Sequence, residues 1–195
     1  MRLVFVRESD LDHTGDAMTS AILSDGQPIS EDEFLAIGET PDRIELFDGS
    51  LVMTPAPTTI HQQIVGELYA ALRTPARRAG VRALPGANVR LSPSRILIPD
   101  FLITTEMTNS LIIDAGAVVL ICEVATPSRL IKKQYYAAAG IPWYLLVEQD
   151  TGTLHFHRLA GDAYMEHSVT KPGDVLHLTE PVIADIDPEE LLSPR

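Results

Sequence analysis

The sequence predicts a mixed α/β fold, in which a central mixed β-sheet is flanked by a few helices and followed by additional antiparallel strands at the C-terminal end. The order of the apolar patterns predicts it: a hairpin, an amphipathic helix, a central group of strands, a second helix and a strand-rich end. The apolar fraction of 45% and the length of 195 residues suit one folded domain with a sizeable core. We expect residues 1–29 to form an arm or a partly ordered extension and residues 30–195 to form a single domain.

The first elements of the expected domain are a short helix and a hairpin. Ser30 stands three residues before Glu33 in "SEDEFLAI", which is the capping-box spacing at the start of a helix. Alternating apolar residues flank Asp48-Gly49 in "RIELFDGSLVMT", and this dipeptide tolerates the positive φ angles of a type I′ turn.

A long amphipathic helix is predicted by "TTIHQQIVGELYAALR". Its apolar residues recur every four positions, as one face of a helix requires. The stripe consists of Ile60, Ile64, Leu68 and Leu72, widened by Val65 and Ala71. His61 falls in the first turn of this helix.

Strands dominate the remainder of the chain. Short central strands are predicted by "ANVRL", "RILI" and "PDFLITT", and a buried strand by residues 117–124. C-terminal strands are predicted by "WYLLVEQ", "TLHFHRL", "AYMEHSV" and "DVLHL", which turn sequences separate. Between the two groups, "SRLIKKQYYAAAG" predicts a helix that Ser128 caps and that ends at Gly140.

Charge and cysteine content exclude several classes of protein. The net charge of -12 argues against a protein that coats DNA by neutralising its phosphates. Two basic stretches, residues 73–82 and 129–133, are most simply solvated surface. The single cysteine, Cys122, excludes an intramolecular disulfide and a multi-cysteine zinc site. No signal peptide or membrane-spanning segment is predicted, so we expect a cytoplasmic protein.

Two carboxylates on core strands are the best candidates for chemistry. Glu123 lies within the buried strand, where an uncompensated charge is costly, and Asp100 follows a proline at the start of another strand. Two such acids can share a divalent cation, and Mg²⁺ held in this way serves phosphodiester chemistry. The alternatives are an ion-paired buried acid for Glu123 and a turn or strand-end residue for Asp100. Lys132 and Lys133 follow on the next helix, and their spacing alone does not choose between them.

The signature blocks resemble a known family. "RIELFDGSLVMTPAPTTIHQQIVGEL", "ILIPDFLI", "CEVATPS" and "KKQYYAAAGIPWYLLVE" are similar, in order, to blocks of the bacterial Uma-type family of restriction endonucleases in the PD-(D/E)xK nuclease superfamily. The resemblance covers about residues 30–165. It implies a restriction-endonuclease-like core, a Mg²⁺- or Mn²⁺-dependent cleavage of DNA, and a homodimer.

The same resemblance implies roles for individual residues. Asp100 and Glu123 match the two metal-binding acids, and Lys132 matches a catalytic lysine that has moved to the following helix. Glu45 matches an acid that the superfamily often uses as an extra metal or water ligand. His61 matches a histidine near the phosphate, and the carbonyl of Val124 is expected to help bind the metal.

One departure from the family pattern supports alternative functions. The segment from Ser128 to Lys132 is shorter than in the family by more than a helical turn. Together with the negative charge, this favours a catalytically weak or inactive nuclease fold that serves as a binding or assembly module. A metal enzyme that acts on a small phosphate ester is a third hypothesis.

Other residues have simpler interpretations. His155 and His157 alternate on a strand and share a face, which suits a metal in principle, but a half-buried strand face explains them as well. Tyr135, Tyr136 and Trp143 are most simply packing residues.

Overall fold

The structure is a computed structural model that describes residues 3–6, 20–23, 27–38, 40, 42–54, 56–125 and 131–192. The chain forms two compact units: Met1–Pro57 with Arg90–Ile98, and Thr58–Val89 with Pro99–Arg195. A single domain over residues 30–195 stays a prediction. Among the described residues, no helix combines the length and the apolar character needed to cross a bilayer.

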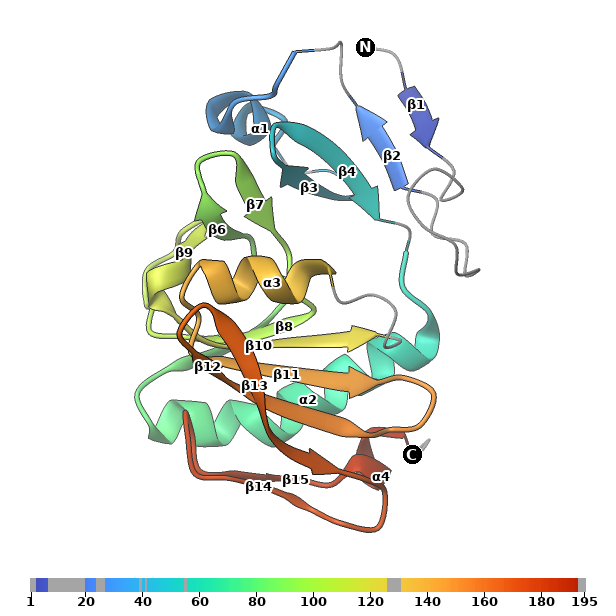
Figure 1. The fold of residues 1–195 in the computed structure, drawn as a ribbon, viewed down its shortest axis with the longest axis vertical. Coiled ribbons are helices and arrows are strands. Elements are labelled where there is room, and N and C mark those ends of the chain that lie inside the picture. Colours follow the sequence, from blue (N-terminus) through green and yellow to red (C-terminus); the bar gives the residue numbers. More distant parts are fainter. Residues whose placement is uncertain are drawn as a thin grey trace. The chain divides into compact units, whose positions relative to one another are not determined.

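The first unit is built on antiparallel strands in the order β1-β2-β4-β3-β7-β6 (Figure 1). Its elements are β1 (Leu3–Val6), β2 (Ser20–Leu23), α1 (Glu31–Ala36), β3 (Arg43–Phe47), β4 (Ser50–Thr54), β6 (Val89–Ser92) and β7 (Arg95–Leu97). Strands β1 and β2 were not predicted.

Local sequence signals in this unit are confirmed. The predicted hairpin is β3 and β4, and both turn residues have positive φ angles, 49° at Asp48 and 80° at Gly49. A type I′ turn requires this conformation at both central positions. The predicted capping box is also present, because the Ser30 hydroxyl accepts from the Glu33 N–H and the Glu33 carboxylate accepts from the Ser30 N–H.

The second unit contains a six-stranded mixed sheet in the order β13-β12-β11-β10-β8-β5. These strands are β5 (Arg82–Pro85), β8 (Phe101–Thr104), β10 (Val118–Ala125), β11 (Trp143–Glu148), β12 (Leu154–Ala160) and β13 (Ala163–Thr170). β10 and β11 pair in parallel and are connected through α3 (Ile131–Ala138), whereas the other neighbours pair antiparallel. The predicted fold class, with its C-terminal antiparallel strands, is confirmed.

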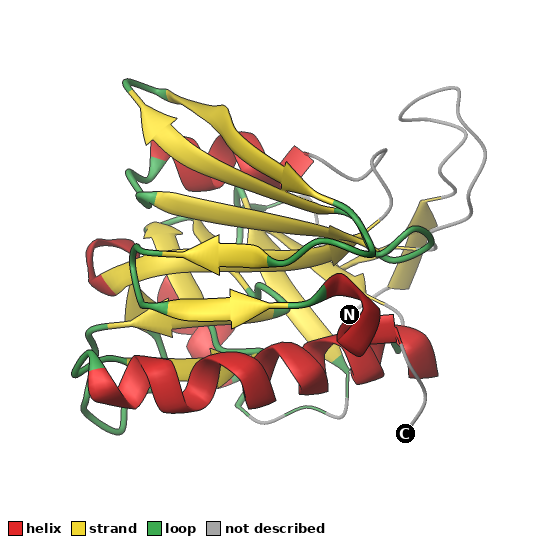
Figure 2. Ribbon diagram, turned by 90° about the horizontal axis from the view of Figure 1, so that it is seen from below, coloured by secondary structure: helices red, strands yellow, loops and turns green. Residues whose placement is uncertain are grey.

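Helices cover both faces of this sheet. α2 (Thr59–Arg78) lies against one face and α3 against the other, as Figures 1 and 2 show. The smaller elements of the unit are β9 (Ile113–Asp114), a 3-10 turn (Ala115–Ala117), the hairpin of β14 (Leu176–Leu178) and β15 (Ala184–Ile186), and α4 (Pro188–Leu192).

The main core lies between α2 and the sheet. The predicted stripe supplies Ile64, Leu68 and Leu72, all with no exposed surface, but Ile60 is 52% exposed because it stands in the first turn. The sheet contributes alternate residues, among them Phe101 on β8 and Cys122 on β10. Because successive strand residues point to opposite faces, Glu123 is directed away from α2 and toward α3.

Candidate active site

Strand register brings the two predicted acids together. β8 and β10 pair antiparallel with Phe101 opposite Cys122 and Leu102 opposite Ile121. Continuing this register by one residue places Asp100 opposite Glu123, at the end of the paired segment. Side chains at such cross-strand positions are close neighbours. Both residues are only 8% exposed.

Asp100 is held by groups from two different elements. Its Oδ2 accepts a hydrogen bond from the Val124 N–H of β10 at 2.9 Å and lies 3.0 Å from Nε2 of His61. His61 is placed by the first turn of α2, where the hydroxyl of the N-cap residue Thr58 accepts from the His61 N–H. Nδ1 of His61 is buried and has no hydrogen-bond partner among the described residues.

Glu123 is contacted by two side chains from α3. The hydroxyl of the fully buried Tyr136 donates to Glu123 Oε1 at 2.6 Å, and Lys132 Nζ lies 4.0 Å from the same oxygen. Residues four positions apart share one face of a helix, so the same face presents both groups. The sequence assigned Tyr136 to packing alone, although its spacing from Lys132 already placed the two residues on one helix face.

The structure separates the two lysines. Lys133 Nζ lies over the ring of Tyr144, 5.8 Å from the centroid, instead of beside Glu123. Burial lowers the pKa of Lys133, and the charge of Glu166 opposes this effect. The N-cap expected at Ser128 and the shortened segment before Lys132 fall largely outside the described residues. Lys132 nevertheless comes within 4.0 Å of an acid oxygen.

The surroundings of the acids are buried and negative. Burial, followed by the charges of Asp100 and Glu123, raises the pKa of the Cys122 thiol well above its usual range. Burial and the charge of Glu123 likewise raise the pKa of Tyr144. A cation is therefore favoured beside Asp100 and Glu123.

The carboxylates of Asp100 and Glu123 fit a hard divalent cation that keeps part of its hydration shell. The described residues contain no group of three or more His, Cys, Asp and Glu side chains able to hold a metal ion. Two carboxylates are nevertheless a usual protein contribution to Mg²⁺, which keeps several waters and takes substrate oxygens in its remaining positions.

Glu45 belongs to the first unit and is buried, with 1% of its surface exposed, although a strand glutamate is usually exposed. Its Oε1 accepts from the Ile98 N–H at 2.6 Å, and the guanidinium of Arg43 donates to the Ile98 carbonyl. These contacts fix the peptide two residues before Asp100 in the chain. A role for Glu45 as a metal ligand stays a prediction, as does that of the Val124 carbonyl.

The histidines of β12 are engaged elsewhere. His155 lies between two carboxylates, with Nε2 3.1 Å from Glu148 and Nδ1 3.4 Å from Glu166. The ring of His157 is 6.4 Å from that of His155, and its Nδ1 lies 3.1 Å from the His155 carbonyl. Both therefore have partners within the protein.

Comparison with known proteins identifies the family. The sequence profile of Uma2, described as "Putative restriction endonuclease", matches residues 31–187. The chain belongs to the Uma2 family. The predicted resemblance to this family is thus confirmed, and the description of the family points to a nuclease.

A solved structure shares the fold of this Uma2 chain. It is the crystal structure of a putative nuclease belonging to DUF820 from Anabaena variabilis, with a TM-score of 0.64 and 18% identity. The match covers 85% of this chain and 98% of that one. No curated protein matches the chain.

Proposed function

We propose that this protein is a Mg²⁺- or Mn²⁺-dependent endonuclease that hydrolyses phosphodiester bonds of DNA. One observation carries the proposal: two buried carboxylates, Asp100 directly before β8 and Glu123 on the neighbouring β10, face each other when the strand register is continued by one residue, and Lys132 lies beside Glu123. The match to the Uma2 family supports the same reaction class.

Asp100 and Glu123 would hold the metal ion, with the Val124 carbonyl and Glu45 as the expected additional ligands. Mg²⁺ held by these residues would supply Lewis-acid polarisation of the phosphate and would lower the pKa of a bound water. The Val124 N–H and the Tyr136 hydroxyl orient the two acids, which fixes one oxygen of each carboxylate.

Lys132 supplies a positive charge where negative charge develops on the phosphate. Preorganised cations of this kind stabilise the transition state because they need no rearrangement during the reaction. His61 Nε2 lies 3.0 Å from Asp100 Oδ2 and helps to hold that carboxylate in place.

The net charge of -12 shapes how DNA would bind. Affinity would depend on the metal and on a few local cations, so its dependence on salt would be shallow. We propose a homodimer, since cutting both strands of a duplex commonly uses two sites.

The test is relaxation of supercoiled plasmid by the purified protein in Mg²⁺ or Mn²⁺. Asp100→Asn and Glu123→Gln should abolish nicking, as should a chelator. Asp162→Asn makes the same chemical change in an exposed turn and should leave nicking intact. Equal nicking by all of these variants would show that the assigned site is wrong.

The second candidate is a nuclease fold that binds without cleaving, which the negative charge and the shortened segment before Lys132 favour. Calorimetry with Mn²⁺ distinguishes the two. Metal binding that Asp100→Asn removes, without nicking by the unaltered protein, would support the binding module over the enzyme.

A further inference from the structure

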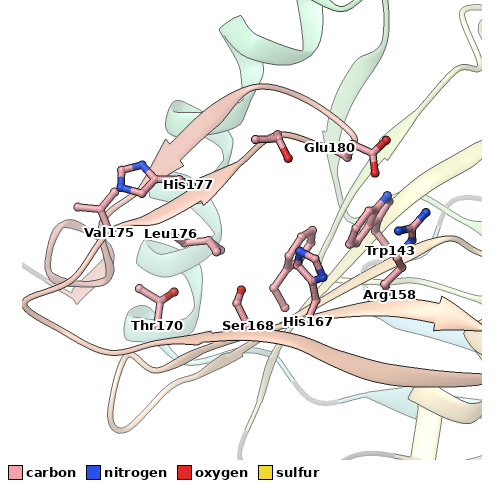
Figure 3. Close-up of a pocket in the computed structure, with 11 residues that line it drawn as sticks. Trp143, Arg158, His167, Ser168, Thr170, Val175, Leu176, His177 and Glu180 are labelled. Atoms are coloured by element: carbon pink, nitrogen blue, oxygen red, sulfur yellow. The ribbon is translucent and has the colours of Figure 1, made fainter.

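A hollow lies in the second unit, on the sheet face that carries the main core (Figure 3). It encloses about 330 Å³ between residues of β11, β12 and β13 on one side and of β14 with the following turn on the other. Trp143 lines it and belongs to the α2-side core, together with Cys122. Glu123 points to the other face, so the hollow is separate from the candidate active site.

The floor of the hollow is a rigid aromatic group. Trp143 and Phe156 are stacked with ring centroids 4.6 Å apart and planes 4° from parallel. His167 stands edge-on to both rings, and the guanidinium of Arg158 lies 5.4 Å from the Trp143 centroid. This arrangement offers an apolar surface bordered by cationic and polar groups.

Several hydrogen-bond donors in this hollow are unused. Trp143 is 6% exposed and Thr170 is 7% exposed, yet neither the indole N–H nor the hydroxyl has a hydrogen-bond partner among the described residues. The Arg158 guanidinium and the His167 ring form no hydrogen bond or ion pair with described residues either. The exposed Arg158 and His167 side chains, and the accessible Trp143 N–H and Thr170 hydroxyl, can therefore all donate to an acceptor-bearing molecule in the hollow.

We propose that the hollow binds a compact organic anion: a carboxylate or a phosphate monoester on a small apolar or aromatic body. The unused donors match an anionic head group, and Arg158 is suited to bind carboxylate or phosphate with two parallel hydrogen bonds. The aromatic floor matches the body, and the volume is at the small end for ligand pockets. Glu180 is the one acid among the residues that line the hollow. Its negative charge would repel a second anionic group on the ligand, so we expect a ligand with only one.

The single tryptophan of the chain makes the test direct, because Trp143 emission reports on this hollow alone. The probes are benzoate, phenyl phosphate and inorganic phosphate, followed by fluorescence and confirmed by calorimetry. We expect saturable binding of benzoate or phenyl phosphate, and much weaker binding of inorganic phosphate. The two organic probes distinguish a carboxylate site from a phosphate site.

Variants assign the binding to named groups. Arg158→Gln should weaken binding by about tenfold or more, because a charged hydrogen bond is lost. Thr170→Val keeps the side-chain volume and should also weaken it. The matched control is Arg73→Gln, which removes an arginine lying 5.9 Å over the Tyr69 ring elsewhere in the unit.

The outcome is independent of the proposed nuclease activity, since Asp100→Asn should bind the probe as the unaltered protein does. Two results would overturn the inference: no saturable signal with either organic probe, or inorganic phosphate binding as tightly as phenyl phosphate.

Discussion

The contact between Tyr136 and Glu123 gives the sharpest prediction about stability. Tyr136→Phe removes one hydroxyl and keeps the ring, so it creates almost no cavity in a site with no exposed surface. The lost interaction is a 2.6 Å hydrogen bond to a carboxylate that is 8% exposed. Water therefore replaces the hydroxyl poorly.

The magnitude follows from that geometry. Hydrogen bonds to charged groups contribute about 1.5–3 kcal/mol, and we expect a loss of about 2 kcal/mol because Lys132 Nζ, 4.0 Å away, still compensates part of the charge. With a urea dependence of roughly 2 kcal/mol per molar, the unfolding midpoint should fall by about 1 M.

Urea denaturation followed by circular dichroism measures the change, and Tyr144→Phe is the matched control. Tyr144 is 1% exposed, its ring lies 6.2 Å from that of Tyr136, and its hydroxyl has no hydrogen-bond partner in the described part of the chain. We expect this control to cost less than about 0.5 kcal/mol. Equal losses in the two variants would refute the reasoning, because ring packing and not the bond to Glu123 would then explain them.

Three further predictions concern other positions. Lys132→Met should lower plasmid nicking about 100-fold or more, because it removes the cation beside the acids. Lys133→Met should leave nicking nearly unchanged. Equal losses in the two variants would contradict the assignment of the catalytic role to Lys132 alone. Gly49→Ala should lower the free energy of unfolding by about 2 kcal/mol or more, and Gly161→Ala should lower it by about 1 kcal/mol, as measured by urea denaturation. Both glycines have positive φ, but only a Cβ on the first meets a proline ring at 2.8 Å, so similar losses would refute the steric argument. Burial, followed by the charge of Lys133, lowers the pKa of His157. The folded protein therefore takes up this proton less readily than the unfolded chain, and stability falls as pH drops below about 6.5. His157→Phe should flatten that fall in denaturation at several pH values, and an unaltered slope would contradict it.

Local signals made much of the fold predictable from the sequence. The turn at Asp48-Gly49, the capping box at Ser30 and the apolar stripe of α2 each depend on residues within a few positions of one another. Strands β1 and β2 lacked such a signal, because each has only four residues and gains its place by pairing with other strands. Tertiary pairing of this kind leaves little trace in a short sequence window.

The candidate site was predictable in its residues but not in its contacts. Periodicity placed Lys132 and Tyr136 on one face of α3, yet it gave no information on which face meets β10. That choice depends on how α3 packs against the sheet, which involves residues far apart in the chain. Likewise, the burial of Glu45 depends on its bond to the Ile98 N–H, 53 positions away in the chain.

The burial of Glu123 itself argues for a function beyond folding. β10 is an interior strand of the sheet, and an apolar residue at this position would pack against α3 without desolvating a charge. Instead the chain supplies Tyr136 and Lys132 to one carboxylate, and the Val124 N–H and His61 to the acid opposite it. Compensation of this extent is expected where two negative charges must stay close together, as metal-assisted phosphodiester chemistry requires. Stability alone gives no reason to place them there.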